Sequence, residues 1–128
     1  EAVGNLESFK DFVEGIDMYI RDSMKIGVAI NPSTELEKIF PLVSHVDFVQ
    51  FMGNDTLGHH GVELDEKVLE RIKISREKYP YLPIAIDIGV DQETAPALVE
   101  AGVTKLVSGS AIFNTDDIID TVERFRNL

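Results

Sequence analysis

The stretch LPIAIDIGV, residues 82–90, combines a short apolar strand with a polar exit loop. Residues 82–86 are uniformly apolar, which is typical of a parallel strand covered on both faces, and residues 87–90 form the loop. Periodic apolar positions predict a helix on each side, over 65–78 and 93–101. Because a parallel return between strands needs a long crossover, this order predicts βαβ units and a parallel α/β sheet.

The same plan repeats on both sides of this stretch. Further strands are predicted over 26–30, 46–52 and 104–108, and further helices over 6–23, from 33 or 34 to 43, and over 116–126. No linker or low-complexity tract interrupts residues 1–128, which predicts one domain. The chain therefore offers about four strands of a barrel or a doubly wound sheet, whereas a closed βα barrel needs eight.

The charge of the chain restricts its partners. Twelve Lys and Arg stand against 23 Asp and Glu, which gives a formal net charge of -11. This excess argues against nucleic acid and anionic membrane surfaces, both of which attract basic proteins. No apolar run reaches the roughly 18 residues of a membrane-spanning helix. The absence of cysteine excludes disulfides and thiolate sites, and we expect a cytoplasmic protein.

Asp87 is the strongest single candidate for a catalytic or cation-binding residue. It ends an apolar strand, and the carboxyl ends of parallel strands form the working face of α/β proteins. A carboxylate at this position can accept a proton or bind a cation. The structural alternative is an Asp that caps the next helix or hydrogen-bonds a neighbouring loop.

Gly109 and Ser110 follow the last predicted strand and open a short helical turn. Exposed N–H groups at such a turn can bind phosphate, and glycine lets an anion approach the backbone. The alternative is an ordinary tight turn with a capping serine. No Lys or Arg stands in the exit loops, so a phosphate would be held by amides and hydroxyls.

The remaining polar clusters favour structural interpretations. His59 and His60, beside Asp55 in the longest loop, lack a ligand-type spacing and are expected to be solvated, and His45 precedes a strand. The acidic runs 63–66 and 116–117 are typical of helix starts. The sequence contains no P-loop with lysine, no G-x-S-x-G elbow and no G-x-G-x-x-G.

Four segments in order resemble the C-terminal half of the ribulose-phosphate 3-epimerase family, a TIM-barrel family. The segment 24–34, MKIGVAINPST, resembles its fifth strand and exit, and 46–52, VDFVQFM, resembles its sixth. The segments 86–90, IDIGV, and 107–113, VSGSAIF, resemble its seventh and eighth strands, and the opening Glu1 and Ala2 resemble the end of its fourth. The resemblance implies a (β/α)4-type half-barrel over residues 1–128.

The resemblance also implies a chemistry. The family interconverts ribulose 5-phosphate and xylulose 5-phosphate by moving a proton on and off C3, with a divalent metal (zinc, iron, manganese or cobalt). Asp87 matches an aspartate that is both a metal ligand and an acid–base group, and Met52 is similar to a Met near the metal. The residues that match phosphate-binding positions are Gly58, Gly61, Gly89, Gly109 and Ser110.

Departures from the family pattern leave two hypotheses. Ile88 stands where the family has the first glycine of D-G-G, and the loop 54–61, NDTLGHHG, lacks the usual P-G-F-G-G-Q. The other metal ligands and the opposing aspartate belong to family strands that this chain lacks. It is therefore expected to be an epimerase-type domain that is incomplete alone, or a non-catalytic half-barrel that binds phosphate or self-assembles. A receiver-like domain is disfavoured, because Asn31 and Pro32 occupy the place of its acidic pair.

Open edges also predict a partner. Four strands of a barrel leave unpaired edges and an apolar inner face, and such surfaces associate. We expect a homo-oligomer or closure by a missing N-terminal half-barrel, with a sugar phosphate as the small-molecule ligand.

Overall fold

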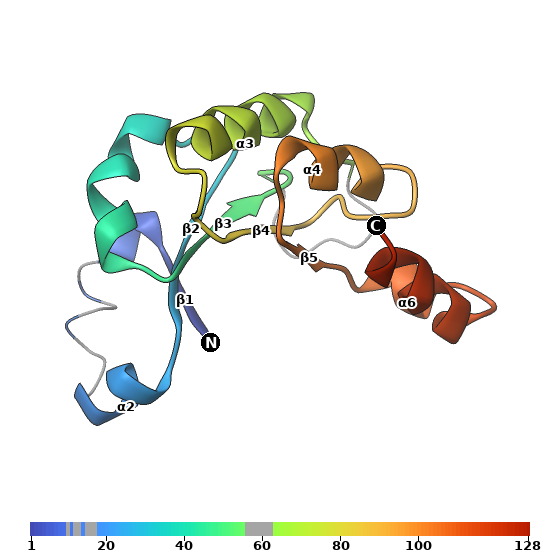
Figure 1. Cartoon of the computed structure of the whole chain (residues 1–128), viewed down its shortest axis with the longest axis horizontal. Coiled ribbons are helices and arrows are strands. Elements are labelled where there is room, and N and C mark those ends of the chain that lie inside the picture. Colours follow the sequence, from blue (N-terminus) through green and yellow to red (C-terminus); the bar gives the residue numbers. More distant parts are fainter. Residues whose placement is uncertain (10, 12–13, 15–17, 56–62) are drawn as a thin grey trace.

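The computed structural model describes residues 1–9, 11, 14, 18–55 and 63–128, and its centre is a parallel sheet (Figure 1). The strands are hydrogen-bonded in sequence order, β1-β2-β3-β4-β5, and every neighbouring pair is parallel. Their bounds are β1 Ala2–Asn5, β2 Ile26–Ile30, β3 Phe48–Met52, β4 Ile84–Asp87 and β5 Lys105–Val107. This order confirms the predicted parallel α/β class.

Eight helical segments within the described residues lie before, between and after these strands. Each of the two longest begins at an aspartate whose side chain accepts a hydrogen bond from a backbone N–H two or three residues on, as the acidic runs predicted. The segments are η1 Leu6–Ser8, α2 Met18–Ser23, η2 Leu36–Lys38, η3 Phe40–His45, α3 Glu66–Lys78, α4 Ala95–Ala101, α5 Ser110–Phe113 and α6 Ile118–Arg126.

The expected count of four strands is too low, because β1 is a fifth. Residues 2–5, AVGN, are too few to predict a strand from the local pattern, and they become one by pairing with β2, from Ala2↔Ile26 to Asn5↔Ala29. Tertiary pairing thus overrides a weak local signal.

Two expected helices also differ from the structure. The segment expected as one helix up to Val43 forms the two short 3-10 helices η2 and η3, because Pro41 has no N–H to continue an α-helix. The helix expected over 6–23 is described only in part, as η1 and α2 with residues 9, 11 and 14 between them. Its other positions lie outside the described residues.

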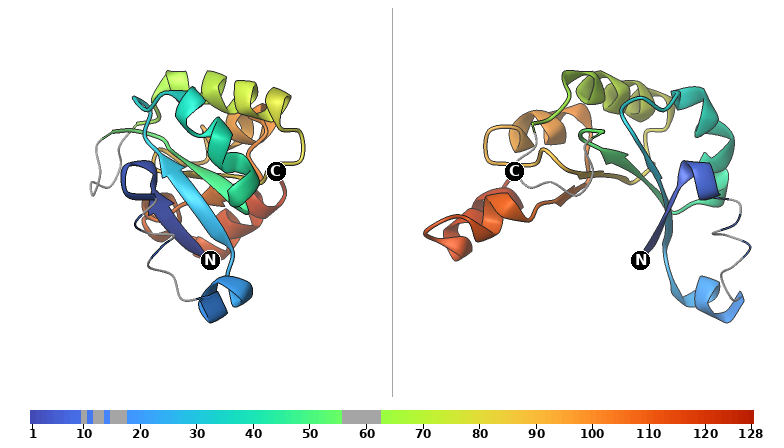
Figure 2. Two further views of the ribbon diagram at one scale, coloured as in Figure 1. Left: turned by 90° about the vertical axis from the view of Figure 1, so that its left-hand side faces the viewer. Right: turned by 180° about the vertical axis from the view of Figure 1, so that it is seen from behind.

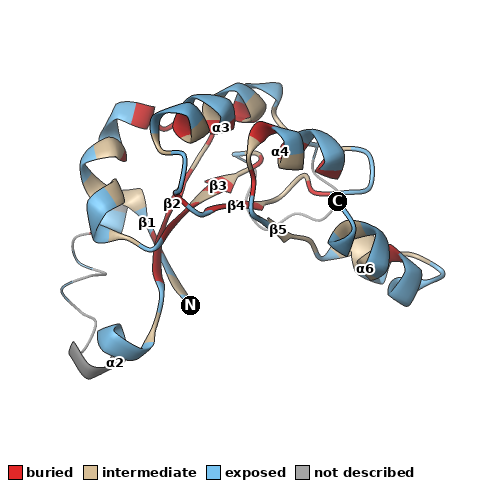
Figure 3. Ribbon diagram, viewed as in Figure 1, coloured by how far each residue is buried: buried red, intermediate tan, exposed pale blue. Residues whose placement is uncertain are grey.

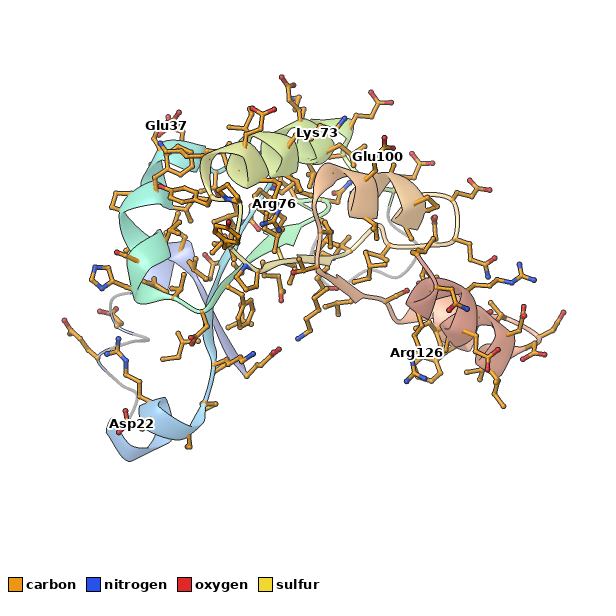
Figure 4. The ribbon with its side chains drawn as sticks, in the orientation of Figure 1. Asp22, Glu37, Lys73, Arg76, Glu100 and Arg126 are labelled. Atoms are coloured by element: carbon orange, nitrogen blue, oxygen red, sulfur yellow. The ribbon has the colours of Figure 1, made fainter. Side chains whose placement is uncertain are left out.

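The core lies between the sheet and the helices α3 and α4, which cover the same side (Figures 1 and 3). Alternate strand residues supply one wall, and Val68 and Ile72 of α3 and Leu98 of α4 supply the other, all fully buried. Arg76 lies at the end of this layer, where its guanidinium donates to the carbonyls of Gly102 and Pro80. In Figure 4 the labelled Glu37, Lys73 and Glu100 point outward from the helical side. This burial explains the apolar residues on the helical side of the strands.

The other face of the sheet is concave and open (Figure 2). Phe48 packs over Gly27 so closely that a Cβ added to Gly27 would lie 2.3 Å from its ring. Lys105 of β5 reaches over the Phe48 ring, at 5.7 Å from its centroid, and forms an ion pair with Glu1, beside β1. The hydrogen bond from Lys105 lowers the pKa of the Glu1 carboxyl. The first and last strands are therefore linked across this face.

Candidate functional site at the carboxyl ends of the strands

Parallel pairing gathers the predicted site residues at one end of the sheet. Met52 and Asp87 are the last residues of neighbouring strands and stand opposite each other in the β3–β4 register. Asp87 also pairs with Val107 of β5, and Gly109 lies two residues beyond Val107. The structure therefore brings Met52, Asp87 and the β5 exit to the same rim.

The carboxylate of Asp87 is half-buried at this rim. Its Oδ1 accepts a hydrogen bond from the Ile88 amide at 2.9 Å, and within the described residues its Oδ2 has no hydrogen-bond partner. It does not cap α4, whose N-cap is Thr94. Asp87 therefore does not cap α4, its hydrogen bond is to the exit loop that follows it, and its Oδ2 is open to a ligand as far as the described residues go.

The loop after Asp87 has an unusual backbone. Ile88 and Gly89 both have φ 73°, the left-handed region that favours glycine and that is strained for a β-branched residue. A Cβ on Gly89 would lie 2.8 Å from the Leu64 Cα, and a Cβ on Gly53 would lie 1.9 Å from the Ile88 carbonyl oxygen. Three chain segments thus meet with no room for a further side chain, and Ile88 has a backbone conformation that favours glycine.

Replacing Ile88 with glycine is expected to leave the free energy of unfolding unchanged or higher. Release of the left-handed strain, worth about 1–3 kcal/mol, offsets the greater chain entropy of glycine. The matched variant Ile86→Gly, two residues earlier and fully buried, is expected to lose about 4 kcal/mol. Urea unfolding of both variants tests this, and an equal loss at the two positions would contradict the assigned strain.

Side-chain hydrogen bonds fix the β4 and β5 exit loops to each other. Ser108 Oγ donates to the Val90 carbonyl at 3.0 Å, and Thr94 Oγ1 donates to the Gly89 carbonyl at 2.8 Å. Asp91 Oδ1 in turn accepts from the Thr94 amide at 2.8 Å. These bonds hold the backbone on both sides of the rim in one arrangement.

Gly109 and Ser110 begin the short helix α5 without a capping bond from a side chain. Gly109 is the N-cap of α5, and its carbonyl accepts from the amides of Ile112 and Phe113. Within the described part of the chain, the amides of Gly109 and Ser110 donate to no partner, and Ser110 makes no capping bond. A Cβ on Gly109 would have nothing within 4 Å. Space and donors without a described partner therefore coincide at the start of α5, two residues beyond Val107, the register partner of Asp87.

Sequence reasoning missed a cation near this rim. Arg71 comes from α3, and its Nη2 donates to the Thr34 carbonyl in the loop after β2, while its Nε is buried without a partner among the described residues. Burial lowers the pKa of the Arg71 guanidinium, against the opposing effect of Glu37, Asp55 and Asp65. The exit loops themselves contain no Lys or Arg. The signal in the sequence that Arg71 faces the sheet was its place next to the buried Ile72 in the predicted helix.

Several predicted residues lie elsewhere or are not described. Gly58 and Gly61, with His59 and His60 between them, lie outside the described residues. Asp55 accepts a hydrogen bond from Ser33 Oγ at 3.1 Å, and His45 is exposed at the end of η3. The phosphate-binding roles of Gly58 and Gly61 therefore stay predictions.

The metal site is not complete in the described part of the chain. No group of three or more His, Cys, Asp or Glu side chains comes together among those residues. A divalent site needs several such ligands, and the rim supplies Asp87, with Met52 Sδ beside it accepting from Gln50 Nε2 at 3.7 Å. The described residues therefore do not fit a bound metal by themselves, and Asp87 stays a single proposed ligand.

Fold and rim together define a parallel β/α protein of the barrel type, with its polar groups at the carboxyl ends of the strands. The structure superimposes on a crystal structure of 3-hexulose-6-phosphate synthase with a TM-score of 0.71 and 18% identity, over 98% of this chain and 59% of the other. That likeness supports the fold. No helix among the described residues is long and apolar enough to cross a membrane.

The sequence identifies the family. Residues 5–113 match the ribulose-phosphate 3 epimerase family. The chain is 31% identical over 104 residues to ribulose-phosphate 3-epimerase of Schizosaccharomyces pombe, covering 81% of this chain and 45% of the relative. It is 30% identical over 105 residues to the cytoplasmic isoform from Oryza sativa subsp. japonica, covering 80% and 46%. This chain belongs to the ribulose-phosphate 3-epimerase family, and it spans less than half the length of these relatives.

Proposed function

We propose that the chain is an epimerase-type domain that binds a phosphorylated ketopentose at the carboxyl rim and supplies one of the two acid–base groups of the reaction. The observation that carries this proposal is the half-buried Asp87 carboxylate, with an oxygen free of described partners, beside the unpaired amides of Gly109 and Ser110. Family membership supports ribulose 5-phosphate and xylulose 5-phosphate as the pair that is interconverted.

The proposed chemical role of Asp87 is proton transfer at C3. The C3–H bond breaks, the proton moves to the carboxylate, and the electron pair forms an enediolate with the adjacent carbonyl group. Return of a proton to the opposite face inverts the centre. One carboxylate cannot serve both faces of a carbon, so the second acid–base group must come from outside the described residues. Alone, the chain is expected to epimerise poorly.

The proposed phosphate site uses backbone donors. The amides of Gly109 and Ser110 point to no other described partner, and the open space at Gly109 lets an anion approach. Gly89 and the stretch containing Gly58 and Gly61 are proposed to complete it. Buried Arg71 supplies positive charge near the neighbouring β2 exit, which offsets part of the acidic field.

The family resemblance implies a divalent metal that polarises the sugar oxygens when bound. Asp87 is the one ligand that this chain is proposed to contribute, and the others would come from outside the described residues. The proposed role of Asp87 in proton transfer rests on the position of its carboxylate at the carboxyl ends of the strands.

Binding of ribulose 5-phosphate tests the proposal by NMR. In a 1H–15N titration, the amide resonances of Gly89, Gly109 and Ser110 are expected to shift, with a Kd of about 1 mM because half a site binds weakly. Ribulose without phosphate is the matched control and is expected to shift them far less. Shifts confined to the cleft of about 340 Å³ between α4, β5 and α6, lined by Val99 and Phe125 among others, would contradict the assigned site.

A non-catalytic half-barrel that binds phosphate or assembles is the alternative. It is favoured because Asp87 is the one described carboxylate that matches a family acid–base position, and because no group of three or more metal ligands comes together among the described residues. Turnover of ribulose 5-phosphate with a divalent metal distinguishes the two. Rapid epimerisation by this chain alone would contradict the proposal that a second acid–base group is missing.

A further inference from the structure

We propose that Asn31, the residue directly after β2, is a further substrate-binding residue whose side-chain amide donates a hydrogen bond to the C1 hydroxyl of a ketose phosphate at the rim. This inference rests on the proposed function and deepens it, because it names the residue that recognises the sugar end of the ligand. Two observations carry it, the place of Asn31 on the sheet and a carboxamide that the fold does not use.

Asn31 extends a row of rim residues on the concave face of the sheet. Ile30 and Phe51 pair with each other and are buried in the core on the helical side. Because strand side chains alternate between faces, Asn31 and Met52, the next residues along, fall on the opposite face, which is concave (Figure 2). Met52 pairs in turn with Asp87. Asn31, Met52 and Asp87 therefore form one row at the carboxyl ends of three neighbouring strands.

The order of groups along the rim matches the order of groups along a ketose phosphate. Neighbouring strands are about 4.8 Å apart, so the backbones at Asn31 and Asp87 are about 10 Å apart, with Met52 between them. The proposed phosphate donors, Gly109 and Ser110, follow β5 on the other side of Asp87. A ligand with its phosphate at β5 and its C3 at Asp87 therefore directs C1 toward β2, where Asn31 is the rim residue.

The carboxamide of Asn31 makes no hydrogen bond with the described part of the chain. Its Oδ1 is buried there without a partner, and no described residue accepts from its Nδ2. The great majority of buried polar atoms in proteins are paired, so an orphaned one is a cost that needs an explanation. Ligand binding explains it, because functional sites are where proteins keep local features that do not favour the fold.

The backbone that carries this carboxamide is held in place. The Asn31 amide donates to Thr34 Oγ1 at 3.3 Å, and the Asn31 carbonyl accepts from the Thr34 amide at 3.0 Å. Arg71 Nη2 donates to the Thr34 carbonyl and ties this turn to α3. A donor on a preorganised turn loses less freedom on binding. Because the carboxamide is neutral, it offers a hydrogen bond to a hydroxyl without a second charge in the row of Asp87.

Replacing Asn31 with alanine separates a binding role from a structural one. Because the side chain has no described hydrogen bond to lose, Asn31→Ala is expected to leave the urea midpoint of unfolding unchanged or to raise it. Asn54 is the matched control, since its Nδ2 donates to the Glu63 carbonyl at 3.0 Å, and Asn54→Ala is expected to lower the midpoint. Equal losses for the two variants would assign Asn31 to the fold and overturn the inference.

NMR titration with two ligands tests the contact itself. Ribulose 5-phosphate is expected to shift the side-chain NH2 resonances of Asn31, which are assigned by their absence from the Asn31→Ala spectrum. Glycerol 3-phosphate, which keeps the phosphate and lacks counterparts of C1 and C2, is expected to leave them in place. Asn31→Ala is expected to raise the Kd of ribulose 5-phosphate about three- to tenfold, the effect of one neutral hydrogen bond, and to leave that of glycerol 3-phosphate unchanged.

The outcomes of this titration separate the inference from the proposed function. If ribulose 5-phosphate shifts the amides of Gly109 and Ser110 but not the Asn31 side chain, the role of Asn31 is overturned and the proposed function stands. An equal loss of affinity for both ligands in Asn31→Ala would also overturn that role. If ribulose 5-phosphate shifts none of these resonances, the proposed function fails, and the inference fails with it.

Discussion

Replacing Gly53 with alanine is expected to destabilise the protein by about 3 kcal/mol or more, the upper range for overpacking, since the obstacle is backbone. The added Cβ would lie 1.9 Å from the Ile88 carbonyl oxygen. Gly53 cannot move aside, because its amide donates to the Asp87 carbonyl and its carbonyl accepts from the Asp65 amide, both at 2.7 Å. Urea unfolding followed by circular dichroism measures the loss.

Gly109→Ala is the matched control for this effect. A Cβ at Gly109 meets nothing within 4 Å, and its φ of -117° suits any residue, so the free energy of unfolding is expected to change by less than about 0.5 kcal/mol. Its affinity for ribulose 5-phosphate is expected to fall, because the methyl group occupies the proposed anion approach. Equal stability losses for the two variants would contradict the close approach at Gly53.

Asp87→Asn is expected to lower the residual epimerisation by this chain by about 100- to 10,000-fold, the usual contribution of a general acid–base group. The amide cannot accept the C3 proton, but its Oδ1 can still accept the hydrogen bond from the Ile88 amide, so folding is expected to be preserved. Turnover of ribulose 5-phosphate by this chain, with a divalent metal present, measures the loss.

Asp91→Asn controls for loss of an aspartate in the same loop. Asp91 Oδ1 accepts from the amides of Glu93 and Thr94, so its replacement is expected to affect loop stability with little effect on turnover. An Asp87→Asn chain that turns over as fast as the unaltered one would contradict the acid–base role. If the unaltered chain shows no turnover with a divalent metal present, the non-catalytic alternative is favoured.

Where local signals were strong, the structure follows the sequence closely. The helix expected over 65–78 is α3 Glu66–Lys78 with Asp65 as its N-cap, because apolar period, capping residue and the following proline agree. The strands around Val28, Phe51 and Ile86 were visible as apolar runs. Where signals conflicted, prediction failed: Pro41 divided an expected helix, and β1 had no apolar run to reveal it.

The sequence by itself determined the order of four of the five strands, the parallel class and the placement of Asp87 and Gly109 at strand ends. These follow from local periodicity, because parallel strands necessarily bring their carboxyl ends to one edge. Only the tertiary structure decided the left-handed backbone at Ile88, the approach of Gly53 to it and the reach of Arg71 toward the β2 exit. Each of these depends on segments distant in sequence meeting at contact distance, and no local pattern records which atoms will face each other there.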